Sequence, residues 1–200
     1  MTTRHLDLGC GAVPRNPYGR DEICGVDLSG GNGTGPIRCA NLATQAIPFE
    51  SDHFDSASAY DFLEHVPRVL GTADGKGTRF PFIELMNEVW RVLKPGGLFY
   101  AVTPVYPGAA AFMDPTHVNI MTADTHTYFT RPQRMAAMYG FHGDFVVRRV
   151  QRTRPDPARA FIPPPANWWQ RVRLAHRIWR GACGHLIWEF EAIKPPQQQA

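Results

Sequence analysis

Short apolar runs, each followed by a glycine or a polar residue, recur along the first half of the chain. They predict buried strands that end at residues 8, 27, 39 and 60, and a further strand over residues 98–103. Residues 81–93 instead carry apolar side chains at steps of three and four, which predicts an amphipathic helix. Pro81 suits the first turn of this helix, and Gly96 suits its end.

The last third of the chain shows a different pattern. Residues 131–139 precede a glycine and predict a helix, whereas 145–152 and 185–193 predict two strands, the second by its alternation of apolar and polar residues. Between these strands lies an insertion at about 153–184 that begins with a proline-rich linker. Two hundred residues with 44% apolar content suit one α/β unit, so we expect a single domain over 1–200.

Inside this insertion, residues 167–180 predict a helix that is both basic and rich in tryptophan. Its stripe and its remaining surface carry different residues: Trp168, Val172, Ala175 and Trp179 on the stripe, and Arg171, Arg173, Arg177 and Arg180 over the rest. Such a helix most often packs its tryptophans against its own domain. A basic helix of this kind can also lie weakly on a membrane surface or on a partner. Both interpretations remain open.

Charge is distributed unevenly along the chain, although the net charge is only +3. From residue 131 onward there are twelve basic and four acidic residues, against nine and fourteen before it. A basic region beside an acidic one indicates an anionic partner, such as a phosphorylated or carboxylated substrate, a nucleic acid or a membrane surface. A solvated basic face is the alternative. No nucleic-acid-binding module is visible, so we expect no nucleic acid partner.

The richest chemical signal follows the first strand. Gly9 and Gly11 stand at the tip of this strand, where glycine lets the backbone approach a ligand closely. Asp27 ends the next strand, where a carboxylate can accept two hydrogen bonds from a ribose diol. The pattern predicts an adenosine-containing cofactor across the carboxyl ends of a parallel sheet. A tight strand-to-loop turn without a ligand is the alternative interpretation.

The residues after Gly11 distinguish between classes of cofactor. A dinucleotide site needs a third glycine so that a pyrophosphate can sit on a helix N-terminus. Here Pro14 occupies that region and Pro17 follows, which disfavours a regular helix directly after the glycines. A pyrophosphate cradle is therefore poorly supported.

Three sequence segments together indicate a family. The segment 6–11 resembles motif I of the class I S-adenosylmethionine (SAM)-dependent methyltransferases. Residues 63–66 (Leu-Glu-His-Val) resemble the segment that follows strand four in many small-molecule members, and 93–97 (Leu-Lys-Pro-Gly-Gly) resemble their link between helix five and strand five. Val13 departs from the family, which usually has a small residue there. The resemblance covers residues 4–103 well and 131–152 more loosely.

The resemblance implies a three-layer α/β sandwich with a seven-stranded, mostly parallel sheet whose last strand is antiparallel. It also implies that SAM is the cofactor. In the family, a polar residue after strand three meets the adenine amino group, so Asn41 takes that role here and Leu42 packs on the ring face. The cofactor-binding residues expected from the resemblance are Asp7, Gly9, Cys10, Gly11, Asp27, Leu28, Asn41, Leu42, Tyr60 and Asp61.

Candidate catalytic residues lie in two segments after strands four and five. His65 follows the first, and Asp114 with His117 could form an oriented acid–imidazole pair after the second. A base is needed only for a hydroxyl or a protonated amine, because the sulfonium leaving group needs no acid. For each histidine a structural hydrogen bond is the alternative role, and His117 is the first candidate for catalysis.

The cysteines and the termini bear on metal content and compartment. The chain has four cysteines, which are Cys10, Cys24, Cys39 and Cys183. They lack the Cys-x-x-C spacing of metal or redox sites, so we expect reduced thiols and no metal. No apolar run approaches the roughly eighteen residues that span a bilayer. The first strand begins almost at residue 1, which argues against a signal peptide. We therefore expect a cytoplasmic protein, and its oligomeric state is not predicted.

The leading hypothesis is a SAM-dependent methyltransferase that acts on an oxygen or nitrogen of a small-molecule or glycan-type acceptor. The basic region would suit an acceptor that is anionic. One alternative is an NAD-dependent oxidoreductase or other nucleotide-binding enzyme, which Pro14 disfavours. The other is a non-catalytic subunit of the SAM-binding fold that supports a partner.

Overall fold

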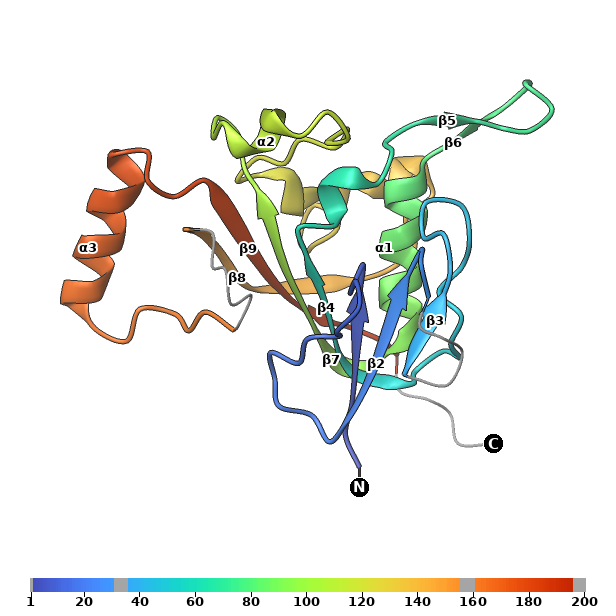
Figure 1. Ribbon diagram of the computed structural model, residues 1–200, viewed down its shortest axis with the longest axis horizontal. Helices are drawn as coiled ribbons and strands as arrows, with labels where there is room; N and C mark the ends of the chain where they lie inside the picture. Colours follow the sequence, from blue (N-terminus) through green and yellow to red (C-terminus); the bar gives the residue numbers. More distant parts are fainter. Residues whose placement is uncertain (1, 31–35, 155–160, 196–200) are drawn as a thin grey trace.

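The computed structural model describes residues 2–30, 36–154 and 161–195 (Figure 1). Its main sheet contains seven strands, which are β1 (Arg4–Leu8), β2 (Glu22–Asp27), β3 (Ile37–Cys39), β4 (Phe54–Tyr60), β7 (Leu93–Pro104), β8 (Phe145–Thr153) and β9 (His185–Ala192). A small hairpin is formed by β5 (Leu70–Gly71) and β6 (Thr78–Arg79). The helices are α1 (Pro81–Val92), α2 (Ala110–Met113) and α3 (Trp168–Trp179), with short 3-10 helices η1 (Leu63–His65), η2 (Thr125–Tyr128) and η3 (Met135–Tyr139).

The main sheet has the strand order β3-β2-β1-β4-β7-β9-β8. All neighbouring strands are parallel except that β9 is antiparallel to both β7 and β8. The predicted seven-stranded, mostly parallel sheet with an antiparallel last strand is thereby confirmed. Because β1 is central, the loops after β1, β2 and β4 meet at one edge of the sheet, where ligands of open α/β sheets bind.

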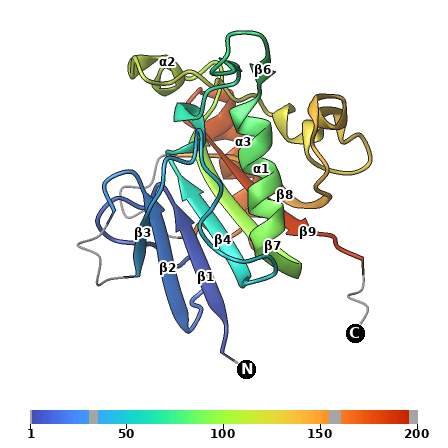
Figure 2. The same ribbon diagram turned by 90° about the vertical axis from the view of Figure 1, so that its right-hand side faces the viewer.

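One face of the sheet is covered by α1, as Figure 2 shows. Pro81 occupies the first turn as predicted, and the apolar stripe of α1 is buried against the strands. The helix ends at Val92, because Leu93 is already extended and begins β7. Gly96 is therefore not the helix stop that its position suggested. It lies within β7 with φ of +74°, where the pairing of β7 with β4 changes register.

The opposite face of the sheet is covered by segments without helix. Tyr18 from the loop after β1 packs there with Phe161 and Ile162, against Tyr100 of β7. Within the described parts of the chain, this third layer of the α/β sandwich consists of loops. Proline-rich composition explains the missing helix after β1, because Pro14 and its neighbours cannot continue a regular hydrogen-bonded ladder.

Two helices of the last third differ from their predictions. The predicted helix at 131–139 is reduced to the 3-10 helix η3, because Arg134 adopts φ of +46° and starts it late. The helix α3 is present, capped by Asn167, whose side chain accepts the N–H of Gln170. None of its side chains is buried, and Figure 1 shows it projecting from the body of the molecule. The expectation that its tryptophans pack against the domain is therefore wrong.

Candidate functional site

The glycine loop lies at the carboxyl end of β1 and has the two predicted special positions. Gly9 and Gly11 adopt φ of +61° and +62°, a backbone conformation that side chains disfavour. A Cβ at Gly9 would overlap the ring of Phe62, which follows β4. A Cβ at Gly11 would meet nothing within 4 Å. Gly9 is thus required by packing, whereas Gly11 leaves open space directly beside the backbone.

Asp27 faces this loop from the end of β2. Its Oδ2 accepts the N–H of Gly11 at 2.9 Å, and its Oδ1 accepts the N–H and the hydroxyl of Ser29 at 3.1 and 2.9 Å. Partial burial raises the pKa of the Asp27 carboxyl, but the hydrogen bonds from Ser29 and Gly11 outweigh burial and hold the pKa below its usual value. Since a carboxylate offers about four acceptor positions, capacity for a ligand hydroxyl remains.

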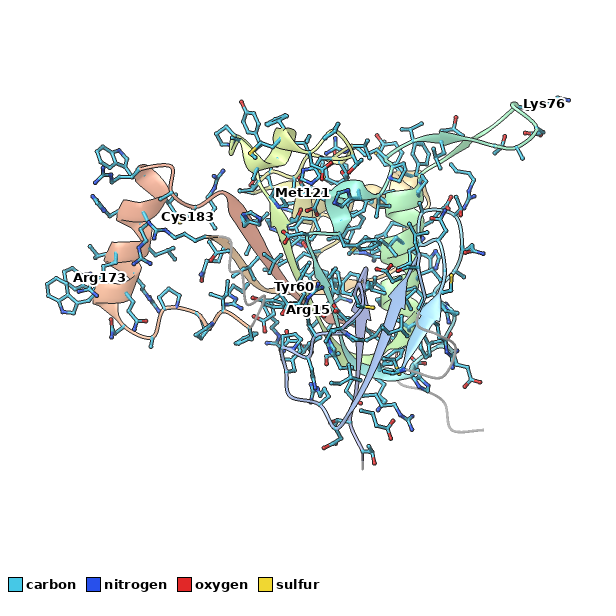
Figure 3. All side chains as sticks on the ribbon, viewed as in Figure 1. Arg15, Tyr60, Lys76, Met121, Arg173 and Cys183 are labelled. Carbon is cyan, nitrogen blue, oxygen red and sulfur yellow. The ribbon has the colours of Figure 1, made fainter. Side chains whose placement is uncertain are left out.

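Asp7 has a different place from the one predicted. Its side chain is fully buried, with Oδ2 accepting the N–H of Arg15 at 2.8 Å and Oδ1 accepting the hydroxyl of Ser58 at 2.7 Å. Tyr60 is buried on the same face, with the Arg15 guanidinium 5.2 Å from its ring centroid (Figure 3). Direct contact of Asp7 or Tyr60 with a cofactor is therefore not supported. Asp7 instead holds the loop that carries the glycines.

The segment after β3 also departs in part from its prediction. Asn41 is exposed, as a ligand contact requires, although its Oδ1 already accepts the N–H of Ala43 at 3.1 Å. Leu42 is only 6% exposed and packs in the core on the α1 side of the sheet. Its predicted packing against an adenine ring is therefore not supported. Leu28, beyond Asp27, is 68% exposed and available.

The remaining predicted cofactor residues frame the loop. The thiol of Cys10 is buried, and burial together with the charges of Asp7 and Asp27 raises its pKa to about 11. Cys10 can therefore contribute its backbone but not a thiolate. Asp61 follows β4 with φ of +47°, and its Oδ1 lies 3.2 Å from Nε2 of His185.

The predicted catalytic residues come together beside this loop. His65 ends η1, three residues after the Phe62 that contacts Gly9, and its ring centroid lies 4.8 Å from that of His117. Asp114 does not form the predicted hydrogen bond to His117, because Nε2 and Oδ2 are 3.9 Å apart. It accepts instead the hydroxyl of Thr116, and that hydroxyl lies 2.9 Å from Nδ1 of His65.

Glu64 is a residue of this group that the sequence prediction missed. Its side chain is 2% exposed, its Oε2 accepts the hydroxyl of Thr103 at 3.1 Å, and its Oε1 lies 4.0 Å from Nε2 of His117. Its backbone carbonyl accepts the N–H groups of Val118 and Asn119, both at 2.9 Å. The available signal was a carboxylate four residues after a buried strand and next to the candidate His65. We refer to Glu64, His65, Asp114 and His117 as the histidine cluster.

An apolar cavity of about 380 Å³ is lined by Asn119, two residues after His117, although none of the four cluster residues lines it. Its lining is largely aromatic, with Phe80, Phe82, Tyr128, Phe129 and Tyr139 among the residues. Asn119 joins it to the cluster segment, since its Oδ1 accepts from Nε of Arg68 at 2.6 Å and its amide donates to the Leu63 carbonyl at 3.2 Å. An apolar cavity of this size with few polar groups is typical of a small-molecule site.

These features fit a nucleoside cofactor better than a dinucleotide. Residues 9–21 contain no helix, so no helix N-terminus follows the glycines to hold a pyrophosphate. The open space beside Gly11 and the ionised Asp27 suit a nucleoside whose ribose diol reaches the carboxylate. A nicotinamide dinucleotide is thus not supported by the loop.

Comparisons with known proteins agree with this geometry. Residues 6–101 match the family model described as a methyltransferase domain. Over 151 residues the chain is 24% identical to 24-methylenesterol C-methyltransferase 2 of Oryza sativa subsp. japonica, covering 73% of this chain but 35% of that protein. The chain thus spans about a third of the length of this curated relative.

Two solved structures share the fold. A SAM-dependent methyltransferase from Archaeoglobus fulgidus is 13% identical with a TM-score of 0.55, covering 95% of this chain and 86% of that one. The phosphoethanolamine N-methyltransferase 1 of Haemonchus contortus, in complex with phosphoethanolamine and S-adenosylhomocysteine, is 9% identical with a TM-score of 0.54, covering 100% and 41%. Residues 6–101 of this chain therefore match a methyltransferase domain, and the chain has the Rossmann-like fold of the solved SAM-dependent methyltransferases.

Proposed function

We propose that this domain transfers the methyl group of SAM to an oxygen or nitrogen of a small-molecule or glycan-type acceptor. The observation that carries the proposal is the histidine cluster, which lies at the same edge of the sheet as the glycine loop because Phe62 contacts Gly9 and His65 follows three residues later. Imidazoles at this place serve acceptors that must lose a proton.

The reaction is an in-line displacement at the sulfonium methyl group. The acceptor oxygen or nitrogen forms a bond to the methyl carbon while the carbon–sulfur bond breaks, and neutral S-adenosylhomocysteine leaves. An imidazole of the cluster takes the acceptor proton. Alignment of the two reactants can contribute roughly 7–11 kcal/mol at best. The chain's own residues therefore position and desolvate the two reactants and deprotonate the acceptor.

Within the cluster, His65 has the better defined orientation. Its Nδ1 contacts the Thr116 hydroxyl, which donates to Asp114, so its Nε2 is left for a proton from the acceptor. His117 lacks such a hydrogen bond on its Nδ1 among the described residues. His65 thus replaces His117 as our first candidate for the base, and the apolar cavity beside Asn119 is the candidate acceptor pocket.

Calorimetry with S-adenosylhomocysteine tests cofactor binding. Asp27→Ala should weaken affinity about tenfold or more, because hydrogen bonds to a charged group contribute about 1.5–3 kcal/mol. Asp74→Ala is the matched control, since Asp74 is exposed in the β5–β6 hairpin and bonds only locally. Binding of NAD but not of S-adenosylhomocysteine would contradict the assignment.

Methyl transfer from radiolabelled SAM into fractionated metabolite and glycan extracts tests the acceptor class. Label on oxygen or nitrogen, lost in His65→Ala with S-adenosylhomocysteine affinity retained, supports the proposal. Label on carbon would contradict the proposed acceptor atom and would agree with the reaction named for the rice relative. An absence of transfer in every fraction would favour the non-catalytic alternative.

A further inference from the structure

The histidine cluster has a second property that proton transfer alone does not explain. One ligand atom from each of Glu64, His65 and His117 lies within 4.8 Å of the other two. These residues come from two segments, η1 and the loop after α2, which the N–H bonds of Val118 and Asn119 to the Glu64 carbonyl hold together. Three potential ligands therefore surround one point.

The separations in this cluster leave room for an ion between the groups. Nε2 of His117 lies 4.0 Å from Oε1 of Glu64 and 3.9 Å from Oδ2 of Asp114, both too long for a hydrogen bond. Ligands about 2.0–2.2 Å from a tetrahedral zinc ion lie roughly 3.3–3.6 Å apart, so ion binding would draw these groups together by a few tenths of an ångström. The His117 ring is 9% exposed, and its Nδ1 has no hydrogen-bond partner in the described residues.

Outer hydrogen bonds orient two of these groups as they do in metal sites. The Thr116 hydroxyl contacts Nδ1 of His65, which leaves Nε2 as its ligand atom, and the same hydroxyl donates to Asp114. The Thr103 hydroxyl donates to the far oxygen of Glu64. Such outer partners fix the tautomer and direction of the ligands.

We propose that Glu64, His65 and His117 bind one divalent transition-metal ion, such as Zn²⁺, with Asp114 in reach as a further carboxylate. Two imidazoles and a carboxylate suit such ions and leave coordination positions open. This inference rests on the proposed function but assigns Nε2 of His65 to the ion instead of to the acceptor proton: the ion would bind the acceptor oxygen and lower the pKa of its hydroxyl. The released proton passes to solvent, the oxygen–carbon bond forms, and the carbon–sulfur bond breaks. No cysteine is needed, so the cysteine spacing does not bear on this site.

Equilibrium dialysis of the intact chain with Zn²⁺ and with Mn²⁺ tests the site directly. The wild type should bind about one ion per chain, and Glu64→Gln or the double variant His65→Ala/His117→Ala should lower the affinity at least tenfold. His142→Ala is the control, because this histidine is exposed and outside the cluster. Circular dichroism establishes that each variant is folded. Ion binding that is absent in wild type, or unchanged in the folded double variant, would overturn the proposal.

A second measurement separates this inference from the proposed function. S-adenosylhomocysteine binding in the presence of a chelator should be retained, since the glycine loop and Asp27 contain none of the metal ligands. Cofactor binding without ion binding overturns the metal site and leaves methyl transfer in place. Ion binding without cofactor binding overturns the proposed function and leaves the metal site in place.

An independent observation concerns the surface of α3. Basic residues of the last third outside α3 are largely neutralised within the fold, since Arg131 pairs with Asp144, Arg148 with Glu191 and Arg149 with Glu189. The helix segment carries Arg171, Arg173, Arg177 and Arg180 and contains no acidic residue. None of these arginines has such a pair among the described residues. Four arginines are thus gathered on the α3 segment, where Figure 3 labels Arg173.

The same helix exposes its apolar stripe. Trp168 and Trp179 of the stripe are 63% and 83% exposed, and Trp169 beside it is 67% exposed. Further apolar side chains lie on α2, where Phe112 and Met113 are 56% and 78% exposed. Helix α2 follows the end of β7, where the N–H of Val105 donates to the Gly184 carbonyl in the segment after α3. Large exposed aromatic groups beside cations indicate an interaction surface.

We infer that α3 docks on an anionic lipid surface. Tryptophan favours the boundary between headgroups and acyl chains, and four arginines without acidic neighbours complement anionic headgroups. No helix in the described residues is long and apolar enough to cross a bilayer. Contact would therefore be peripheral, with α3 lying in the plane of the interface.

Cosedimentation with vesicles tests the docking of α3. Binding to vesicles of phosphatidylcholine with phosphatidylglycerol, with little binding to phosphatidylcholine alone and loss at high salt, is expected. Arg173→Glu/Arg177→Glu and Trp168→Ala/Trp179→Ala should each reduce binding at least fivefold. Met138→Ala, 76% exposed on another segment, is the control. Equal binding to both vesicle types, or a concentration-dependent dimer that buries the tryptophans and excludes vesicles, would overturn the inference.

Discussion

The two faces of the central sheet differ in chemistry although the same strands build both. Alternate residues of a strand point to opposite faces. On the face under α1, β1 contributes Leu6 and Leu8 to an apolar core. On the other face it contributes His5 and Asp7, which are buried and hydrogen-bonded to serines of β4.

The face under α1 mainly stabilises the fold, whereas the polar face shapes the site. The face under α1 gains free energy from apolar burial, which is insensitive to direction. The polar face holds its groups through directed hydrogen bonds that run from His5 through Ser58 to Asp7 and on to the N–H of Arg15. Arg15 belongs to the loop that carries Gly9 and Gly11. The glycine loop is therefore shaped by a buried polar network instead of by a following helix.

Met86→Ala should give the largest loss of stability among the changes we consider. Met86 is fully buried between α1 and the strands, and truncation of such a side chain costs about 2–5 kcal/mol. For a chain of this size that corresponds to a lower Tm by roughly 2–4 °C per kcal/mol. Urea unfolding measures the change. Unchanged S-adenosylhomocysteine affinity at temperatures where the variant is folded is also expected, and a weakened affinity would contradict the separation between the two faces.

Asp7→Ala should have a smaller effect on stability but a larger one on binding. It removes the acceptor of the Arg15 N–H and of the Ser58 hydroxyl, at a cost of about 1.5–3 kcal/mol. Because Asp7 is buried, it touches no ligand itself, yet the freed loop should lose S-adenosylhomocysteine affinity about tenfold. Calorimetry beside urea unfolding measures both. Affinity equal to that of wild type would show that the glycine loop does not depend on the polar face.

Local sequence patterns were sufficient for most of the fold. Strand ends and α1 follow from apolar spacing and turn residues, which act over short distances, whereas the make-up of the sheet was implied by the family resemblance. The absence of a helix after Gly11 followed equally from Pro14. The late start of η3 did not, since it depends on the backbone of Arg134.

The site was predicted less completely, because it depends on which face each side chain reaches. Asp7 and Leu42 stand at the family positions but point into the protein, and Glu64 contributes a buried carboxylate that a motif match did not single out. The tryptophans of α3 formed a recognisable stripe, but whether a stripe is covered is decided by neighbouring segments. The place of each residue along the chain was therefore more predictable than whether its side chain is buried or exposed.

His5→Gln should change the pH dependence of stability on the polar face. Burial, with a smaller effect of the Arg20 charge, lowers the pKa of His5 to about 3, below its value of about 6.5 when unfolded. Below pH 6.5 the unfolded chain therefore binds a proton on His5 that the folded chain does not bind. The free energy of unfolding of the wild type should fall with pH in this range, by at most about 1.4 kcal/mol per pH unit. The variant should show a flatter profile between pH 6.5 and 4 in urea titrations. An equal slope in both proteins would assign the acid sensitivity to other groups.

Gly11→Ala should give the smallest loss of stability and the sharpest test of the loop. Its φ of +62° makes a side chain unfavourable by roughly 1–2 kcal/mol, while the open space around it adds no clash. Gly9→Ala shares this backbone conformation but overlaps the ring of Phe62, so it should destabilise more. For Gly11→Ala we expect S-adenosylhomocysteine affinity to fall at least tenfold, because the new methyl group occupies the space beside the backbone. Retained affinity in this folded variant would mean that Gly11 serves only the turn, and that the ligand approaches the polar face elsewhere.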